Sequence, residues 1–216
     1  MSELDELEAK LQAMREWCRR APANEEGLLA YQSQLKAERE LALAKGEETA
    51  TAFYWTPLWD EAAPEPHLLC SGSKTLLLYY IAEHDPNWDG SYVRMASPAS
   101  QAVRGIALVE FERSTDVKFG GPNDEAGHLL VGRGYGGYGA YLVKNSQWIE
   151  EGKRLASRHP KFDPSTYPEQ NHYLLAFRDQ TLDCLADSYR IEELRVSFPE
   201  ALGLARQRLI EYDEEE

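Results

Sequence analysis

Loop 119–128 concentrates the side chains with the clearest chemical potential. Asp124, Glu125 and His128 offer two carboxylates and an imidazole, groups that bind a metal ion or move a proton during a reaction. The loop is also rich in Asn, Asp, Gly and Pro, which is equally typical of an ordinary turn whose acids accept hydrogen bonds from backbone N–H groups. The sequence leaves a functional and a structural interpretation of these residues open.

A second candidate site lies in two β-rich runs farther along the chain. A turn at Asp179 would make these runs antiparallel neighbours and bring His172 close to Cys184. A cysteine nucleophile requires an exposed thiolate beside an imidazole that a carboxylate orients. Cys184 alternates with Leu182 and Ala186, however, a pattern that favours a small buried hydrophobic side chain. Cys184 is therefore only an outside candidate for a nucleophile beside His172.

Two further motifs match known patterns in part. Residues 132–137 satisfy GxGxxG, but a β-rich run follows where the dinucleotide fingerprint requires a helix, so we expect a tight glycine-rich connection or a loop that contacts a ligand. Residues 85–90 match the opening of a calcium loop, yet Ala96 stands at the position of the closing glutamate, which favours a turn. We therefore expect no cofactor and no metal ion.

Two stretches carry a resemblance to other proteins. Residues 119–126 read FGxPNDEA and are followed by His128, and residues 172–186 read HYxxxFxDxxxxCxA. With them, the block 110–186 resembles a group of uncharacterised bacterial proteins that share these patterns and have no known activity. The resemblance implies that loop 119–128 and the runs around 172–186 form one recurring unit in a bacterial protein. Arg178 stands where that group usually has a second histidine, which weakens a site centred on histidines.

The first 48 residues predict a helical hairpin. Apolar residues recur at spacings of 3, 4, 3 and 4 from Leu4 to Cys18, which gives one helix an apolar stripe, and Ser2 is a plausible N-cap. The break at 21–24 ends this helix, and a second helical face continues to Gly46. Packing of the hairpin on the main domain is favoured over a free arm that binds a partner or a second copy.

From Thr49 onward the pattern changes to short β-rich runs separated by turn residues. The clearest run has Ala107, Val109 and Phe111 on one face and Glu110 on the other, which predicts a sheet with one wet side. Helices are expected over 146–158 and, from the capping box at Ser197, over 197–212. The expected strands are 53–59, 67–70, 75–82, 91–95, 103–112, 139–143, 172–178 and 182–188. The fold class is therefore α+β, with the hairpin 1–48, a mostly antiparallel domain 49–212 with packed helices, and an acidic tail 213–216.

The composition of the chain excludes two classes of binding partner. The chain has 216 residues, and 37 acidic residues outnumber 23 basic ones to give a formal net charge of −14. This charge repels nucleic-acid phosphates and anionic membrane surfaces, so we expect no nucleic-acid or membrane partner. Three widely spaced cysteines, and no apolar run approaching the ~20 residues that span a bilayer, indicate a cytoplasmic protein with reduced thiols.

Two functions of different class follow from this pattern. The leading one is a non-enzymatic interaction protein, an accessory or neutralising partner of another protein, for which the acidic charge favours a basic partner. The hairpin would also allow a homo-oligomer. The alternative is a small-ligand-binding or hydrolytic enzyme that uses loop 119–128 and His172. Convergence of His128, His172 and the acids at 124–125 on one pocket would favour the enzyme.

Overall fold

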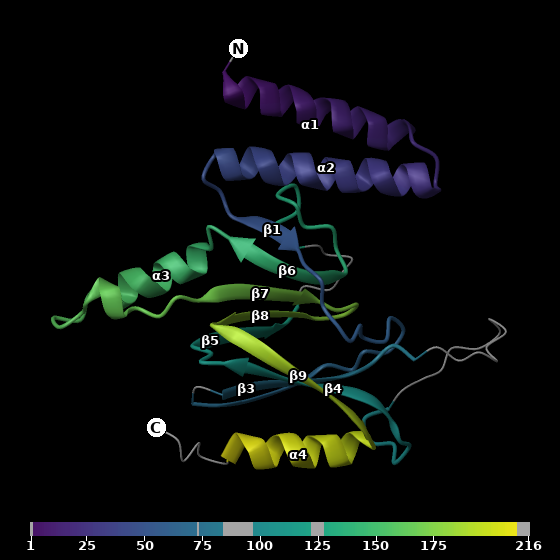
Figure 1. Ribbon diagram of the computed structural model, residues 1–216, viewed down its shortest axis with the longest axis vertical. Coiled ribbons are helices and arrows are strands. Elements are labelled where there is room, and N and C mark those ends of the chain that lie inside the picture. Colours follow the sequence, from purple (N-terminus) through teal and green to yellow (C-terminus); the bar gives the residue numbers. More distant parts are fainter. Residues whose placement is uncertain (1, 73, 84–96, 122–127, 211–216) are drawn as a thin grey trace.

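Two antiparallel β-sheets lie face to face at the centre of this α+β protein (Figure 1). The computed structural model describes residues 2–72, 74–83, 97–121 and 128–210. The five-stranded sheet has the order β1 (Thr49–Ala52), β6 (Gly139–Lys144), β7 (Asn171–Ala176), β8 (Thr181–Ala186) and β5 (Asp116–Gly120). The four-stranded sheet has the order β2 (His67–Ser71), β3 (Lys74–Tyr80), β4 (Arg104–Glu112) and β9 (Ser188–Val196). The predicted fold class is confirmed.

Aromatic side chains fill the space between the sheets. Trp55 stacks on Tyr189 with ring centroids 4.6 Å apart, and Trp59 lies 4.6 Å from Phe177. The Trp55 indole N–H donates to the Tyr79 hydroxyl at 2.8 Å, and that hydroxyl donates to the Pro57 carbonyl at 2.8 Å. The core thus satisfies these polar atoms while it buries the rings, as a buried indole and phenol require.

Strand β4 is buried on both faces, so the prediction of one wet side is wrong. Ala107, Val109 and Phe111 face the aromatic core as expected. Ile106 and Leu108, on the opposite face, pack beneath helix α4 (Phe198–Ile210) together with Phe198 itself. The helix replaces water on this face of the sheet, and only Glu110 and Glu112 near the end of β4 keep partial exposure there.

Helix α4 begins where its capping box predicts. The Ser197 hydroxyl oxygen accepts from the Glu200 N–H at 3.4 Å, and the Glu200 carboxylate accepts from the Ser197 N–H at 2.9 Å. Phe198, Ala201 and Ala205 then recur at helical spacing and are fully buried. The predicted start of this helix differs from the observed one by a single residue, and its predicted end at 212 lies outside the described residues.

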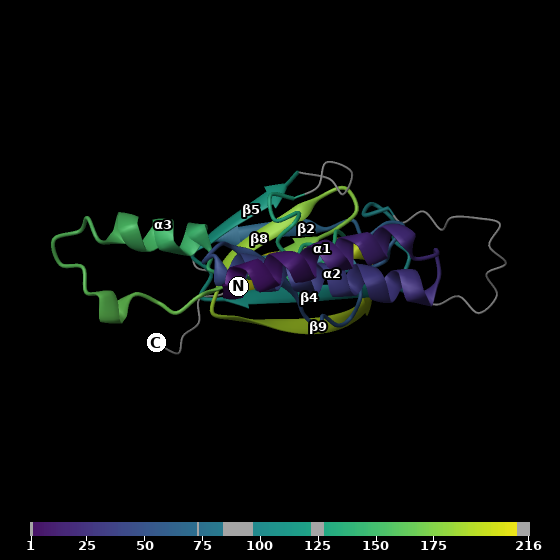
Figure 2. The same ribbon diagram turned by 90° about the horizontal axis from the view of Figure 1, so that it is seen from above.

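The N-terminal hairpin consists of α1 (Glu3–Arg20) and α2 (Glu25–Ala44), as predicted. Helix α1 packs chiefly on α2, and α2 packs on the edge strand β1, so the helices form successive layers on that edge (Figures 1 and 2). The Tyr31 hydroxyl donates to the Gly136 carbonyl at 3.1 Å and ties α2 to the segment before β6. The hairpin therefore docks on the main domain through its second helix.

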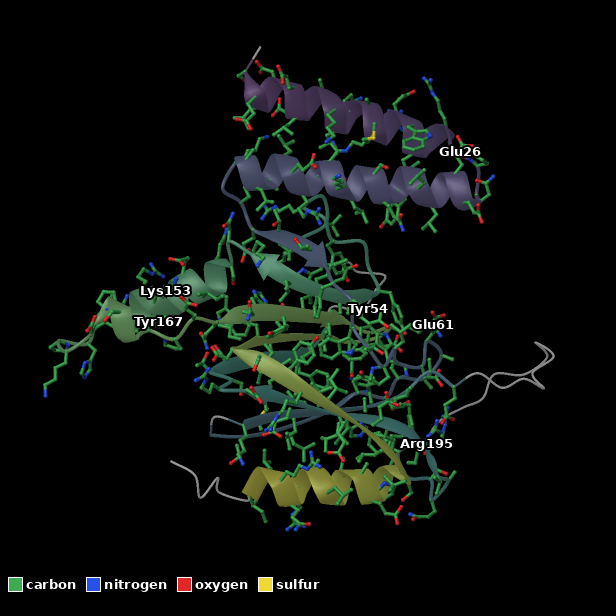
Figure 3. All side chains as sticks on the ribbon, viewed as in Figure 1. Glu26, Tyr54, Glu61, Lys153, Tyr167 and Arg195 are labelled. Carbon is green, nitrogen blue, oxygen red and sulfur yellow. The ribbon has the colours of Figure 1, made fainter. Side chains whose placement is uncertain are left out.

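Helix α3 (Gln147–Ala156) projects from one end of the five-stranded sheet. Together with the 3-10 turn Pro164–Thr166 it forms an arm that extends beyond both sheets (Figure 2). Lys153 and Tyr167 lie on this arm, whereas Glu26 lies at the far end of the hairpin (Figure 3). No helix in the described part of the chain is long and apolar enough to cross a bilayer.

One strand prediction needs correction, and two observed strands have no counterpart among the predictions. The first strand covers 49–52 rather than 53–59, because Phe53 and Trp55 turn into the core and only Trp59 forms a bridge, with Ile81. Strands β5 and β9 were not predicted from the sequence. The expected strand 91–95, the calcium-like motif 85–90 and the tail 213–216 lie outside the described residues.

Candidate functional site

Two histidines converge on one carboxylate at the outer face of the five-stranded sheet. The Nε2 atom of His172 lies 2.8 Å from Oδ1 of Asp183, which is a hydrogen bond. The Nε2 atom of His128 lies 3.9 Å from Oδ2 of the same carboxylate, an ion-pair distance rather than a hydrogen bond. The side chains of His128, His172 and Asp183 are 13%, 7% and 14% exposed, so the cluster is largely shielded from water.

Strand parity explains this convergence. Asp183 in β8 pairs with Leu174 in β7, and cross-strand partners share a face of the sheet. His172 lies two residues from Leu174 and therefore on the same face as Asp183. His128 reaches the face from the segment between β5 and β6.

A serine completes the hydrogen bonding of His172. Strand β6 ends at Lys144, Asn145 adopts a positive φ of 53°, and Ser146 becomes the N-cap of α3. The Ser146 hydroxyl oxygen lies 2.9 Å from Nδ1 of His172 and also accepts from the Ile149 N–H at 3.3 Å. Ser146 is itself buried. A continuous chain of hydrogen bonds thus runs from Ser146 through His172 to Asp183.

The bonding partners assign the tautomers of both imidazoles. The Asp183 carboxylate accepts a hydrogen bond from Nε2 of His172, so this nitrogen carries the proton. Nδ1 of the same ring then accepts from the Ser146 hydroxyl. The Leu130 N–H donates to Nδ1 of His128 at 3.3 Å, so the neutral His128 ring also carries its proton on Nε2. Both rings therefore direct an N–H group toward the same carboxylate.

Asp183 remains ionised in this setting. Burial alone would raise the pKa of Asp183, but the imidazoles of His128 and His172 outweigh burial and lower the pKa to about 2. The carboxylate therefore carries its negative charge throughout the physiological pH range. A fixed anion beside His172 favours the Nε2 tautomer and would stabilise the ring if it gained a proton.

Trp148 forms a wall beside His172. Its ring lies edge-on to the imidazole, with centroids 5.4 Å apart. The indole N–H donates to Asp116 at 3.1 Å, and the Lys118 ammonium lies 3.7 Å above the indole ring. Lys118 is the cross-strand partner of Asp183, so the edge strand β5 borders the same cluster. Charged groups thus hold the indole against His172.

The glycine-rich segment 132–137 packs beside His128. A strand follows it, as predicted. Gly134 has a φ of +90°, and a Cβ atom there would lie only 2.5 Å from the Ala50 carbonyl oxygen, so a side chain is excluded by both conformation and contact. The neighbouring Tyr135 is buried, and its ring lies 5.3 Å from that of His128. The close approach at Gly134 thus anchors the segment that carries His128.

The structure separates the candidates predicted from the sequence. His128 and His172 come together, whereas Asp124 and Glu125 lie outside the described residues. Cys184 leaves the candidate site, because its side chain points into the core between the sheets, away from the face that holds His172. Burial raises the pKa of the Cys184 thiol to about 12, so it stays protonated and is no nucleophile.

Two members of the cluster were missed in the sequence. The sequence predicts Ser146 only as the start of a helix. Its position between a strand and a helix was a usable signal, because it fixes where the hydroxyl lies. Asp183 interrupts the apolar run of β8, and a charged residue at such a position signals a satisfied polar contact. Neither signal identifies the partner, because the pairing depends on the register of two strands and a loop.

Other features of the described residues do not add to this site. No group of three or more His, Cys, Asp or Glu side chains among them is arranged to hold a metal ion. A cavity of about 1170 Å³ lies between α3 and the segment 162–171, with Phe162 and Tyr167 in its wall. None of His128, His172 and Asp183 lines it. Comparison with protein-family models, curated proteins and solved structures finds no match.

Proposed function

We propose that the cluster around Asp183 is the acid–base centre of a small-molecule hydrolase. The observation that carries the proposal is the relay in which Ser146 bonds to His172 and His172 bonds to Asp183, with distances of 2.9 and 2.8 Å. These distances lie within the reach that proton transfer between side chains requires. The proposal takes up the enzymatic alternative that the sequence raised. The relay of Ser146, His172 and Asp183 replaces Cys184 as the reactive group.

Each group has a distinct task in this proposal. His172 accepts a proton at Nδ1 and later returns it, which makes His172 the general base and then the general acid. Asp183 fixes the tautomer of His172 and stabilises the imidazolium that forms, without taking the proton itself. His128 lies against the second oxygen of the carboxylate and holds it in place. Asp183 and His128 are therefore positioning residues for His172.

A substrate panel tests the proposal. The purified protein is assayed with p-nitrophenyl acetate, p-nitrophenyl butyrate and p-nitrophenyl phosphate, as wild type and as His172→Gln. Glutamine keeps a polar side chain but removes the base, so we expect kcat/KM to fall by about 10²–10⁴-fold on any substrate that is hydrolysed.

His67→Gln is the matched control for this assay. His67 lies in β2 of the other sheet, where its ring bonds to the Glu65 carbonyl. Its replacement should leave the rate unchanged. Equal rates for wild type and His172→Gln, or no hydrolysis of any substrate above the buffer rate, would contradict the proposed function.

We also propose an interaction function for the hairpin, the function that the sequence favoured. Its support is the exposure of α1 and of the first turns of α2. The first turn of α2 carries the exposed acids Glu25 and Glu26, and Leu28 and Leu29, which follow them, are 58% and 55% exposed. An acidic surface beside exposed leucines suits a partner with a basic and partly apolar surface.

An affinity pull-down tests the interaction function. The tagged full chain is incubated with lysate of its native cells at low and at high salt, beside a Glu25→Lys/Glu26→Lys variant and a Glu169→Lys control. A basic protein should be retained in stoichiometric amount by wild type and control at low salt only, and the double variant should lose it. Retention that neither salt nor charge reversal changes would contradict this function.

A further inference from the structure

We propose that Ser146 is a nucleophile that becomes acylated during turnover, and that the substrate is an uncharged carboxylic ester. This inference rests on the proposed hydrolase function and deepens it. It names the atom that attacks, the covalent intermediate and the class of substrate.

The hydrogen bonds of Ser146 give its proton one acceptor. The Ser146 oxygen accepts from the Ile149 N–H at 3.3 Å, which leaves the hydroxyl proton directed at Nδ1 of His172, 2.9 Å away. The opposite nitrogen of the ring is held by Asp183 at 2.8 Å. A nucleophile, a base and a group that orients the base are thus in sequence, which is the arrangement that activates a serine. Here the ring presents Nδ1 to the serine, the reverse of the more familiar orientation.

The reaction balances with these groups and water. Oγ of Ser146 forms a bond to the ester carbonyl carbon while the hydroxyl proton passes to Nδ1 of His172. The tetrahedral intermediate then loses its alkoxide, which takes the proton from His172 and leaves as an alcohol. A water molecule repeats these steps on the acyl-serine, releasing a carboxylic acid and the free Ser146 hydroxyl.

The first turn of α3 supplies a donor for the oxyanion. The N–H groups at the start of a helix have no acceptor within the helix. In α3 the Gln147 N–H donates to Glu48, and the Ile149 N–H to Ser146 itself. The Trp148 N–H, two residues from the serine, has no hydrogen-bond acceptor among the described residues. We assign it to the carbonyl oxygen of the bound ester, where negative charge develops.

The charges around Ser146 favour an uncharged ester. Asp183 stays anionic beside His172, whereas the Lys118 ammonium above the Trp148 ring offsets the Asp116 carboxylate that bonds to its indole. The charge of Asp183 would repel a phosphate ester or an acyl chain that ends in a carboxylate. The edge of the Trp148 ring offers an apolar surface beside the imidazole instead.

Covalent labelling with an alkyl fluorophosphonate tests the inference. Attack by Oγ on phosphorus displaces fluoride and leaves a stable adduct, which intact-mass measurement and peptide mapping detect. We expect one adduct per chain, located at Ser146, and no adduct in Ser146→Ala. His172→Gln should slow labelling by about 100-fold or more, because the serine loses its base.

Ser197→Ala is the matched control. Ser197 is also a buried serine that caps a helix, but its partner is Glu200 rather than a histidine. Its loss removes a helix cap, worth about 1 kcal/mol, without touching the relay, so labelling should match that of wild type. Ser146→Asn keeps a capping oxygen and removes the hydroxyl, and it replaces Ser146→Ala if the alanine variant does not fold.

The outcomes separate this inference from the hydrolase function. An unlabelled wild-type chain, or an adduct that maps to another residue, would overturn the role of Ser146. If the ester panel is still hydrolysed in a manner that depends on His172, the hydrolase function survives and His172 activates water directly. Faster hydrolysis of p-nitrophenyl phosphate than of p-nitrophenyl acetate would overturn the substrate class.

Discussion

Phe177→Ala is expected to lower the free energy of unfolding by about 3–5 kcal/mol. Phe177 is 1% exposed and lies between the sheets, where its ring centroid is 4.6 Å from that of Trp59 and 6.0 Å from that of Tyr79. Its removal leaves a cavity that these rigid rings cannot close, so both the burial of the ring and its contacts are lost. Urea denaturation followed by tryptophan fluorescence measures the change.

Phe119→Ala provides the comparison for this prediction. Phe119 belongs to the edge strand β5 and is 38% exposed, so water already reaches its ring. Its loss should be clearly smaller, about 1 kcal/mol, since less apolar surface is involved. Equal losses for the two variants would show that the core between the sheets is not the main source of stability.

Asp183→Asn is expected to remove about 2 kcal/mol of stability at neutral pH. The pKa of Asp183 is about 2 in the folded chain against an ordinary value of 3.8. Between these values the unfolded state binds more protons than the folded state, so stability rises with pH in this window. The contribution is complete above about pH 4 and is lost as the pH falls toward 2. The size follows from the shift at about 1.4 kcal/mol per pKa unit.

The pH profile distinguishes charge from packing at this position. In Asp183→Asn the increase in unfolding free energy between pH 2 and pH 4 should be smaller than in wild type by the same ~2 kcal/mol. Asp179 is exposed in the turn between β7 and β8, so Asp179→Asn should retain the wild-type slope. A wild-type slope in Asp183→Asn would refute a stabilising charge at the cluster.

Local sequence patterns predict most of the helices and strands, but they do not predict which elements pack on one another. Helix spacing, capping serines and strand alternation predict the hairpin, α4 and most of the sheet. They fail for β9, which carries four charged residues (Arg190, Glu192, Glu193 and Arg195), and for the short strand β5. They also fail for the wet face of β4, because only the tertiary structure determines that α4 covers Ile106 and Leu108.

The sequence indicates which residue types could form the candidate site, but it does not predict which of them lie close together. His128 and His172 stand out in the sequence because histidine is a common general acid and base in catalysis. Their shared partner Asp183 depends on the pairing of Leu174 with Asp183 and on the path of the segment 128–138. Cys184 fails as a candidate for the same reason, since one step along a strand moves a side chain to the opposite face. Strand register therefore decides which neighbours in the sequence can react together.

Strand β9 leaves one edge of the four-stranded sheet unpaired over nine residues. Open edges of this length invite another chain to add a strand and begin aggregation. Here Arg190 and Arg195 are exposed, and Glu193 is the cross-strand partner of Ala107, on the face turned toward the core. An added strand would remove water from these charged side chains, which is unfavourable. The charges on β9 thus disfavour the addition of a strand at this edge, while apolar side chains of the same strand close the aromatic core.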